Sequence, residues 1–146
     1  MMRALLAAMM SIAPLISLSA CAAQTEPRHE GLTSASLGGL EIRLIDEQGR
    51  CAVARADSAP LVLDMKWPCR FSEDQQKKVR VEDYRKALVV MVERSEPLPP
   101  PGTECATDLQ SIRLYKGKLD VSPVSRVAAC GPGYWDQKVL IWQFDW

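Results

Sequence analysis

Apolar and polar residues alternate along most of the chain beyond residue 40, and a period of two is typical of half-buried β-strands. The clearest example is the segment 40–44, in which Leu40, Ile42 and Leu44 lie on one face and two charged residues on the other. A more continuous apolar run at 86–93 predicts a more fully buried strand. The same reasoning predicts strands at 51–55, 61–67, 79–84 and 138–146, and a hairpin over 109–123 centred on Gly117.

Turn-forming residues separate these segments, for example in 46–50, and polar or Gly-rich loops are expected at 72–78 and 131–136. The segment 96–102 contains four prolines, which cannot donate to a sheet ladder, so we expect a stiff connection outside the sheet interior. Seven or eight short strands predict a mainly β protein, a small antiparallel β-sandwich or barrel. A short helix at 72–78 or 134–138 would make the fold α+β, which is the alternative.

The first twenty residues have a different pattern. One basic residue, Arg3, precedes a run of fifteen mostly apolar residues that ends at Leu18. This run is shorter than the roughly 20 residues that a bilayer span needs, and Pro14 disfavours an uninterrupted helix. Small residues follow at 19 and 20. The pattern predicts a cleaved signal peptide over residues 1–20.

The end of this segment, Leu18-Ser19-Ala20-Cys21, resembles the lipobox of bacterial lipoproteins. The resemblance covers the first 21 residues and implies transfer of a diacylglycerol group to the Cys21 sulfur, followed by cleavage before Cys21. Alanine rather than aspartate at position 22 implies an outer-membrane lipoprotein that faces the periplasm. The alternative is ordinary signal cleavage after Ala22, which would release a soluble protein.

Residues 21–39 are mostly small and polar, which predicts a flexible tether behind the lipidated cysteine. Its eighteen residues from 22 to 39 could reach about 60 Å at full extension. The one histidine, His29, falls in this tether and is interpreted as a solvated linker residue. We expect residues 40–146 to form a single β-rich domain.

The chain has five cysteines, and assigning Cys21 to lipid leaves an even set. An exported protein sits in a compartment that permits disulfides, and four cysteines allow three connectivities. The spacing favours one of them, because two of these cysteines flank the turn around Pro60 and two flank the hairpin around Gly117. The predicted pairs are Cys51–Cys69 and Cys105–Cys130.

The register of the hairpin supports the second pair. If Gly117 and Lys118 form a type II′ turn, Lys116 lies opposite Leu119, and the same register extended outward places Cys105 opposite Cys130. Cα atoms of such a non-hydrogen-bonded pair are about 4.5 Å apart, within the range of a disulfide. Pro123 in the second strand could introduce a bulge that shifts this register.

Charge and residue types exclude several function classes. The 18 basic residues balance 18 acidic ones, so no basic excess is available to neutralise nucleic-acid phosphates. With its histidine in the tether, the chain cannot assemble a Ser-His-Asp or Cys-His site. It has no P-loop and no closely spaced cysteine pair for zinc or redox chemistry. Carboxylates such as Glu82, Asp83 and Asp108 are interpreted as solvated charges. We expect no enzymatic activity, cofactor or metal.

Binding is the remaining function class. Trp135, Trp142 and Trp146 fall within twelve residues, and aromatic residues of this kind anchor protein interfaces. Tyr134, Trp135 and Asp136 follow Gly-Pro-Gly on an expected loop, so they are the candidate partner-binding residues. The segment 96–102 is a second candidate surface. Whether the aromatic strand at 138–146 is core or interface stays open.

The expected function is that of a non-enzymatic protein-binding module on the outer membrane. The general build resembles that of envelope-located inhibitor and immunity lipoproteins, which implies a protein partner in the periplasm, a hydrolase or a toxin. An accessory structural role in a cell-envelope assembly is the alternative.

Overall fold

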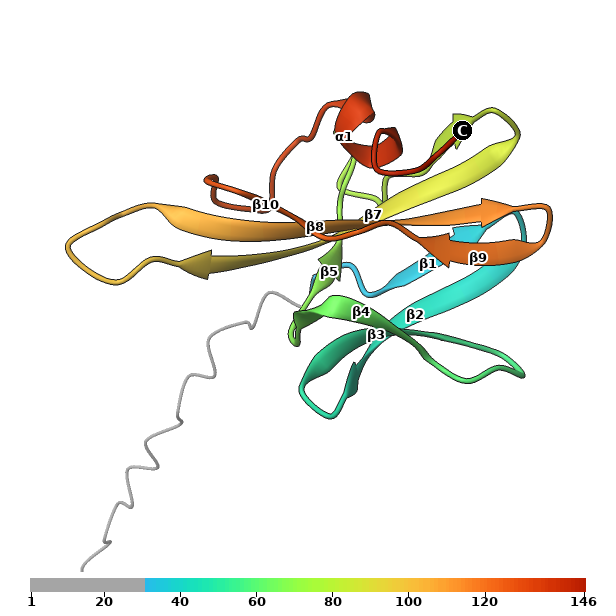
Figure 1. Ribbon diagram of the computed structural model, residues 1–146, viewed down its shortest axis with the longest axis horizontal. Coiled ribbons are helices and arrows are strands. Elements are labelled where there is room, and N and C mark those ends of the chain that lie inside the picture. Colours follow the sequence, from blue (N-terminus) through green and yellow to red (C-terminus); the bar gives the residue numbers. More distant parts are fainter. Residues whose placement is uncertain (1–30) are drawn as a thin grey trace, which may run out of the picture.

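The computed structural model describes residues 31–146, which form two antiparallel β-sheets and one short helix (Figure 1). The first sheet has the strand order β1 (Ser34–Leu37), β2 (Leu40–Glu47), β3 (Arg50–Arg55) and β4 (Leu61–Lys66). The second sheet contains β5 (Arg70–Phe71), β6 (Glu82–Tyr84), β7 (Ala87–Pro97), β8 (Cys105–Tyr115), β9 (Lys118–Val121) and β10 (Ser125–Val127). The mainly β prediction is confirmed, with ten strands in place of seven or eight.

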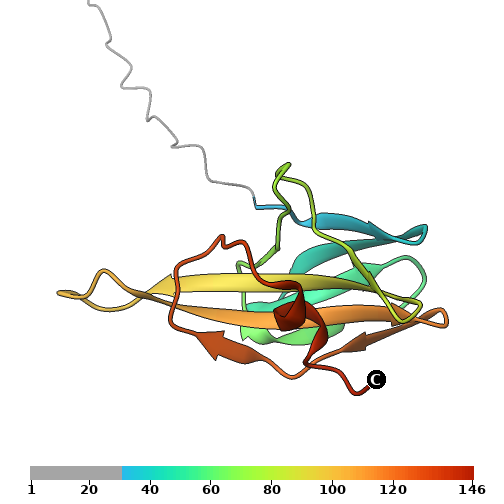
Figure 2. The same ribbon diagram turned by 90° about the horizontal axis from the view of Figure 1, so that it is seen from above.

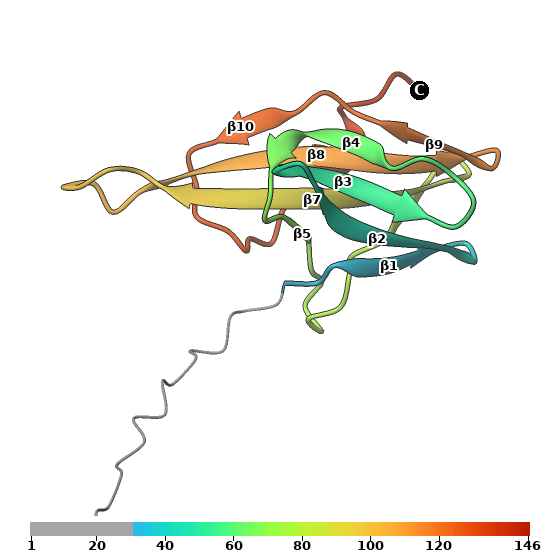
Figure 3. The same ribbon diagram turned by 90° about the horizontal axis from the view of Figure 1, so that it is seen from below.

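The two sheets pack face to face as a sandwich. In the second sheet β7 and β8 are central, β5 and β6 pair with successive parts of β7, and β9 and β10 pair with successive parts of β8. The first sheet covers one face of β7 and β8 (Figure 3), and helix α1 (Gln137–Ile141) lies on the opposite face. The described part of the chain therefore has three layers, a sheet, a second sheet and a short helical segment.

The main core lies between the sheets. Alternation places one face of each strand there, as the sequence predicts for Ile42 and Leu44 of β2, which are both buried. Burial of apolar surface on this scale is the dominant favourable term in folding. The other buried members are Ala35, Leu37, Cys51, Val53, Leu63, Met65, Cys69, Phe71, Val90, Val92, Ile112 and Leu119.

Strand β7 is buried on both faces, as its continuous apolar run predicts. Val90 and Val92 face the first sheet, whereas Val89 and Met91 belong to a second core cluster on the other side. That cluster also contains Leu109 of β8 and the helical segment's Leu140, Ile141 and Phe144. Since β7 is apolar on both faces over residues 89–92, both faces must be covered.

Residues 138–146 do not form the predicted strand, which corrects that expectation. They contain most of α1, which begins after Asp136, whose side chain accepts a hydrogen bond from the backbone N–H of Lys138 at 2.8 Å. A strand would place Leu140, Trp142 and Phe144 on one face, but Leu140 and Phe144 are buried and Trp142 is 74% exposed. The edges of β7 and β8 are already paired, so this segment covers the sheet's face instead.

The predicted tether and the proline-rich connection also differ from expectation. Ser34–Leu37, assigned to the tether, is β1, because Ala35 and Leu37 enter the core and the turn at Gly38 and Gly39 pairs them with β2. The predicted connection 96–102 starts within β7, which continues to Pro97 opposite Cys105. The segment 72–78 is not helical either.

The hairpin register differs from the prediction although the disulfide is correct. Tyr115 pairs with Lys118, so the turn residues are Lys116 and Gly117, both with positive φ as a type I′ turn requires. This register alone would place Cys105 opposite residue 128. The register shifts by one residue near Pro123, since β10 pairs Arg126 with Asp108. Extended to Cys105, the β10 register would place residue 129 opposite it, and Cys130 is one residue beyond that.

Both predicted disulfides are confirmed. Cys51 of β3 and Cys69, directly before β5, join the two sheets inside the main core, with Cα atoms 6.0 Å apart. Cys105 of β8 and Cys130 join the second sheet to the segment that follows β10, with Cα atoms 4.8 Å apart. Cys130 is exposed, so the two bonds lie in different surroundings.

Removing the two disulfides one at a time distinguishes two contributions to the free energy of unfolding, that of closing a covalent loop and that of burying the bond in the core. The loops span 18 and 25 residues, for which chain entropy predicts about 3 kcal/mol each. We expect Cys105→Ala/Cys130→Ala to lower the free energy of unfolding by about this amount, measured by urea titration. Cys51→Ala/Cys69→Ala should cost more because it also leaves a cavity in the core. Equal losses would contradict this difference.

Candidate functional site

The segment 128–146 crosses the outer face of β7 and β8 (Figure 2). We call it the covering segment. Its helix contributes Leu140 and Ile141 to the second core cluster, and Gln143 donates a hydrogen bond to the Ser125 hydroxyl at 2.7 Å. Arg113 of β8 donates to the Asp145 carbonyl at 3.0 Å. Apolar packing and polar anchors together hold this segment on the sheet.

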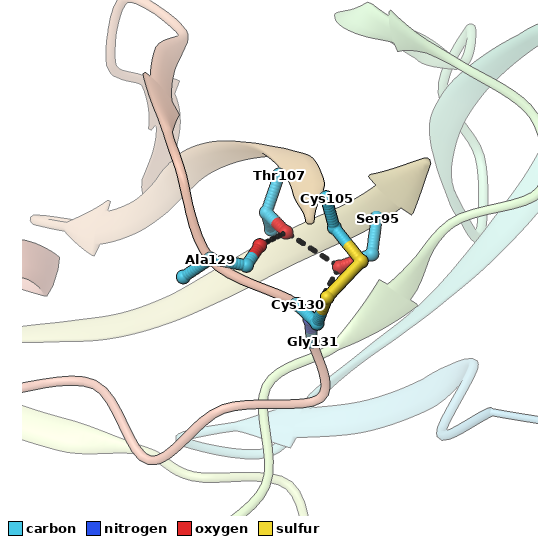
Figure 4. The surroundings of a disulfide bond; sticks show 6 residues. All are labelled: Ser95, Cys105, Thr107, Ala129, Cys130 and Gly131. Carbon is cyan, nitrogen blue, oxygen red and sulfur yellow. Dashed lines mark hydrogen bonds between the residues drawn. A yellow bond between two sulfur atoms is a disulfide. The ribbon is translucent and has the colours of Figure 1, made fainter. Parts of the chain in front are cut away.

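Its first part is attached beside the Cys105–Cys130 bond (Figure 4). Thr107 donates to the Ala129 carbonyl, and the Ser95 hydroxyl accepts a hydrogen bond from the Gly131 N–H at 2.6 Å. The two hydroxyls of Ser95 and Thr107 are 2.5 Å apart. A Cβ atom at Gly131 would lie 2.6 Å from the Ser95 oxygen, so the close approach of the segment requires glycine.

Glu93 is a buried carboxylate under the covering segment. Only 1% of the residue is exposed, and its Oε2 accepts a hydrogen bond from the Trp135 indole N–H at 2.5 Å. The nearest Arg70 nitrogen lies 3.6 Å from Oε1, too far for a hydrogen bond. Burial raises the pKa of Glu93, and the Trp135 hydrogen bond and the Arg70 charge offset this only in part.

An open cleft of about 760 Å³ lies where the two sheets and the covering segment meet. Its volume is typical of small-molecule sites. Both disulfides are close to it, since Cys69 lines the cleft and Gly131 follows Cys130. The remaining lining residues are Gly31, Thr33, Leu44, Trp67, Pro68, Arg70, Glu93, Arg94, Ser95 and Pro132.

The three candidate partner-binding residues have different surroundings. Tyr134 is 66% exposed, and the Arg80 guanidinium lies 4.8 Å from the centre of its ring. Trp135 packs against the second core cluster and binds Glu93, and its carbonyl accepts a hydrogen bond from Arg80. Asp136 caps α1. Their role in binding a partner stays a prediction; Tyr134 and Asp136 are exposed, whereas Trp135 is half-buried.

The other residues singled out in the sequence have structural contacts or lie outside the description. Glu82 pairs with Arg80 at 2.6 Å, and Asp108 accepts two hydrogen bonds from Arg126 at 2.7 and 3.0 Å. Cys21 and His29, like the predicted signal peptide and lipobox, lie outside the described residues. Within residues 31–146 no three His, Cys, Asp or Glu side chains converge as a metal site would require.

Comparison with known proteins gives no assignment: no family model, no curated protein and no solved structure matches this chain. Among the described residues, no helix has the length and apolar character to cross a bilayer.

The raised pKa of Glu93 predicts how stability depends on pH. The folded state binds the proton more readily than the unfolded chain, so the free energy of unfolding should rise as pH falls through the raised pKa, until about pH 4.3. Glu93→Gln, which is neutral throughout, should be at least as stable as the wild type at pH 7 and lose this rise. Denaturant titrations between pH 4 and 7.5 measure both effects.

Glu96→Gln is the control, because the pKa of Glu96 is shifted in the direction opposite to that of Glu93. A hydrogen bond from Arg94 lowers the pKa of Glu96, so its contribution to stability is present at pH 7 and is lost as pH falls through that lowered value. A Glu93→Gln variant that is less stable at pH 7 and recovers at pH 4 would show that burial does not dominate at this carboxyl group.

Proposed function

We propose that this protein is a non-enzymatic protein-binding module that neutralises a hydrolase or toxin in the periplasm. The observation that carries the proposal is the hairpin of β7 and β8, which projects well beyond the rest of the sandwich (Figures 1 and 3). Its end, residues 96–104, is exposed throughout. We call these residues the hairpin tip.

The hairpin tip is built to keep one conformation. Pro97 pairs with Cys105, and the Leu98 N–H donates to the Glu104 carbonyl at 2.9 Å. Three consecutive prolines, 99–101, restrict the turn between them. The Cys105–Cys130 bond ties its base to the covering segment. A loop that is ordered before binding loses little entropy on binding, which favours tight association.

The shape of the tip supports a concave partner. A narrow convex loop with an exposed apolar residue, Leu98, fits a groove better than a flat surface. Substrate grooves are the usual concave surfaces of hydrolases. Blocking such a groove is a way to inhibit an enzyme without catalysis, and it agrees with the expectation drawn from the architecture.

The loop that holds Tyr134 is a second contact surface. It follows Cys130, and Cys130 is bonded to Cys105 at the base of the hairpin tip. The two candidate surfaces identified in the sequence are therefore covalently joined. In this proposal the hairpin tip enters the partner and Tyr134 contributes at the margin of the interface.

The proposal includes a lipid anchor on Cys21 that holds the domain at the outer membrane. Its support is the Leu18–Cys21 lipobox resemblance. The sandwich begins to hold the chain at Leu32, whose carbonyl accepts a hydrogen bond from the Phe71 N–H at 2.7 Å. Ten residues, 22–31, lie between Cys21 and Leu32. At full extension they would let Leu32 lie about 35 Å from the anchor, which is less than a tether extending to residue 39 would allow.

Cys21→Ser tests the anchor. The wild-type chain should incorporate a palmitate analogue and fractionate with membranes, and the variant should lose both properties. Cys51→Ala/Cys69→Ala, which keeps Cys21, is the control and should retain the label. Labelling that persists in Cys21→Ser would contradict lipidation at this residue.

Leu98→Asp tests the hairpin tip. We expect capture of the partner by the wild-type protein, inhibition of the captured enzyme or toxin, and a loss of at least about tenfold in inhibition for Leu98→Asp, because a charge replaces an apolar anchor. Val62→Asp is the matched control, since Val62 of β4 and Leu98 are both 40% exposed. It should inhibit as the wild type does.

Two results would overturn the proposal. If the captured proteins are resident envelope components without hydrolase or toxin activity, the accessory structural role is favoured instead. Equal inhibition by Leu98→Asp and wild type would remove the hairpin tip from the interface. Thermal unfolding of both variants checks that each is folded.

A further inference from the structure

The end of the second sheet opposite the hairpin tip carries exposed basic and aromatic side chains. Arg85 and Lys86 form the turn between β6 and β7, and Lys116 lies in the turn between β8 and β9. Because Leu88 pairs with Leu114 in the β7–β8 ladder, the two turns lie at the same end of the molecule (Figures 1 and 2). We call this surface the basic end, and its exposed residues are Arg85, Lys86, Tyr115, Lys116, Lys118 and Trp146.

The four cations of the basic end are not neutralised by neighbouring carboxylates. Among residues 31–146 none of them forms a salt bridge, whereas Arg113, further along the same strand, is paired with Asp120 at 2.6 Å. At this end of the second sheet and the covering segment, the exposed carboxylates are those of Asp83 and Asp145. The chain as a whole has balanced charge, so the excess of positive charge at this end is local.

Aromatic rings stand among these cations. Tyr115 is 39% and Trp146 is 40% exposed. The Lys116 ammonium lies 5.0 Å from the centre of the Tyr115 ring, and the Arg85 guanidinium lies 5.4 Å from that of Tyr84. Trp146 packs edge-on against Tyr84, with ring centres 4.8 Å apart. Tyr and Trp beside Lys and Arg are typical of the membrane–water interface, where the rings lie at headgroup level and the cations meet phosphates.

We propose that the basic end docks on the surface of a bilayer that contains anionic phospholipids. Each Lys or Arg near such a surface is attracted by its negative potential, and Tyr115 and Trp146 enter the headgroup layer. Two adjacent turns present a convex group of charges, which suits a broad charged surface. None of these residues lines the open cleft, so the two features are separate.

The point where the chain enters the sandwich agrees with a bilayer as the occupant. β1 runs from near Leu32 to the turn at Gly38, and a Cβ atom at Gly38 would lie 3.1 Å from the Leu88 side chain, so this turn lies just behind the basic end. Six extended residues from Leu32 to Gly38 and three more from Leu88 to Arg85 span about 30 Å. Residues 22–31 could span roughly 35 Å, so an anchor at Cys21 allows this contact.

This orientation directs the hairpin tip away from the membrane. The β7–β8 ladder runs from the Leu88–Leu114 pair to the Pro97–Cys105 pair, so the basic end and the tip are about 30 Å apart. A tip in that position can meet a soluble partner. The orientation rests on the proposed anchor and the proposed inhibition, whereas lipid binding by the basic end requires neither of them.

Flotation of residues 22–146 with lipid vesicles tests the binding without an acyl chain. This part contains both core clusters and both disulfides, so it keeps the described fold. Vesicles of phosphatidylcholine with one third phosphatidylglycerol should bind it at least about tenfold more tightly than phosphatidylcholine alone, and high salt should remove the difference. Equal binding to the two kinds of vesicle, or binding to neither, would overturn the proposal.

Variants identify the surface. Lys86→Gln/Lys116→Gln should weaken binding to the anionic vesicles at least about tenfold. Lys66→Gln/Lys78→Gln is the matched control, because it removes the same charge from two exposed lysines outside the basic end, and it should bind as the wild type does. Tyr115→Thr should weaken binding at least about threefold, because it removes an interfacial ring and no charge. Thermal unfolding checks that each variant is folded.

Two further results would overturn the proposal. Equal losses in the two double variants would show that net charge, and not the basic end, attracts the vesicles. Binding of soluble polyglutamate without binding of vesicles would assign the basic end to an acidic protein partner. Neither result bears on inhibition by the hairpin tip or on labelling of Cys21, so this proposal and the proposed function fail separately.

Discussion

Strand β7, at the centre of the second sheet, is apolar on both faces over residues 89–92, and most of the architecture follows from this constraint. Val89, Val90, Met91 and Val92 are all fully buried, so β7 needs a cover on each side. The first sheet provides one cover. The covering segment 128–146 provides the other with only a short helix, and it is held by specific attachments: the Cys105–Cys130 bond, the hydroxyls of Ser95 and Thr107, and the Glu93–Trp135 hydrogen bond.

The sequence predicted those elements whose pattern of apolar residues directly indicates which side chains are buried. Alternation in 40–44 and the continuous run in 86–93 gave the strands, and cysteine spacing gave both disulfides. The predicted hairpin register was wrong, because the turn lies one residue earlier than predicted, which moves the residue opposite Cys105 from 130 to 128. Two one-residue shifts beyond the turn move it back to 130, so the Cys105–Cys130 pairing was nevertheless right. The helix was foreseen only as the alternative at 134–138 and lies slightly later, at 137–141; Leu140, Ile141 and Phe144 have helical spacing and Asp136 is a good N-cap.

The candidate site was less predictable, because it depends on residues that meet only in the folded chain. The cleft combines five separate stretches between residues 31 and 132, and no local pattern reports such a meeting. Glu93 was not singled out in the sequence, although it ends the apolar run 86–93. Its position two residues after Met91, on the same face, was the available signal that it would be buried. Tyr134 was singled out correctly as a loop residue, while Trp135 turned inward to bind Glu93.

The order of the disulfides along the chain has a consequence for how the protein matures. Each cysteine of the domain is bonded to its nearest neighbour in sequence, 51 to 69 and 105 to 130, and the two loops neither overlap nor nest. A chain that enters an oxidising compartment from its N-terminal end would present the first pair completely before the third cysteine arrives. If Cys21 carries lipid as proposed, simple pairing in order of emergence would yield the native bonds without reshuffling of wrong disulfides.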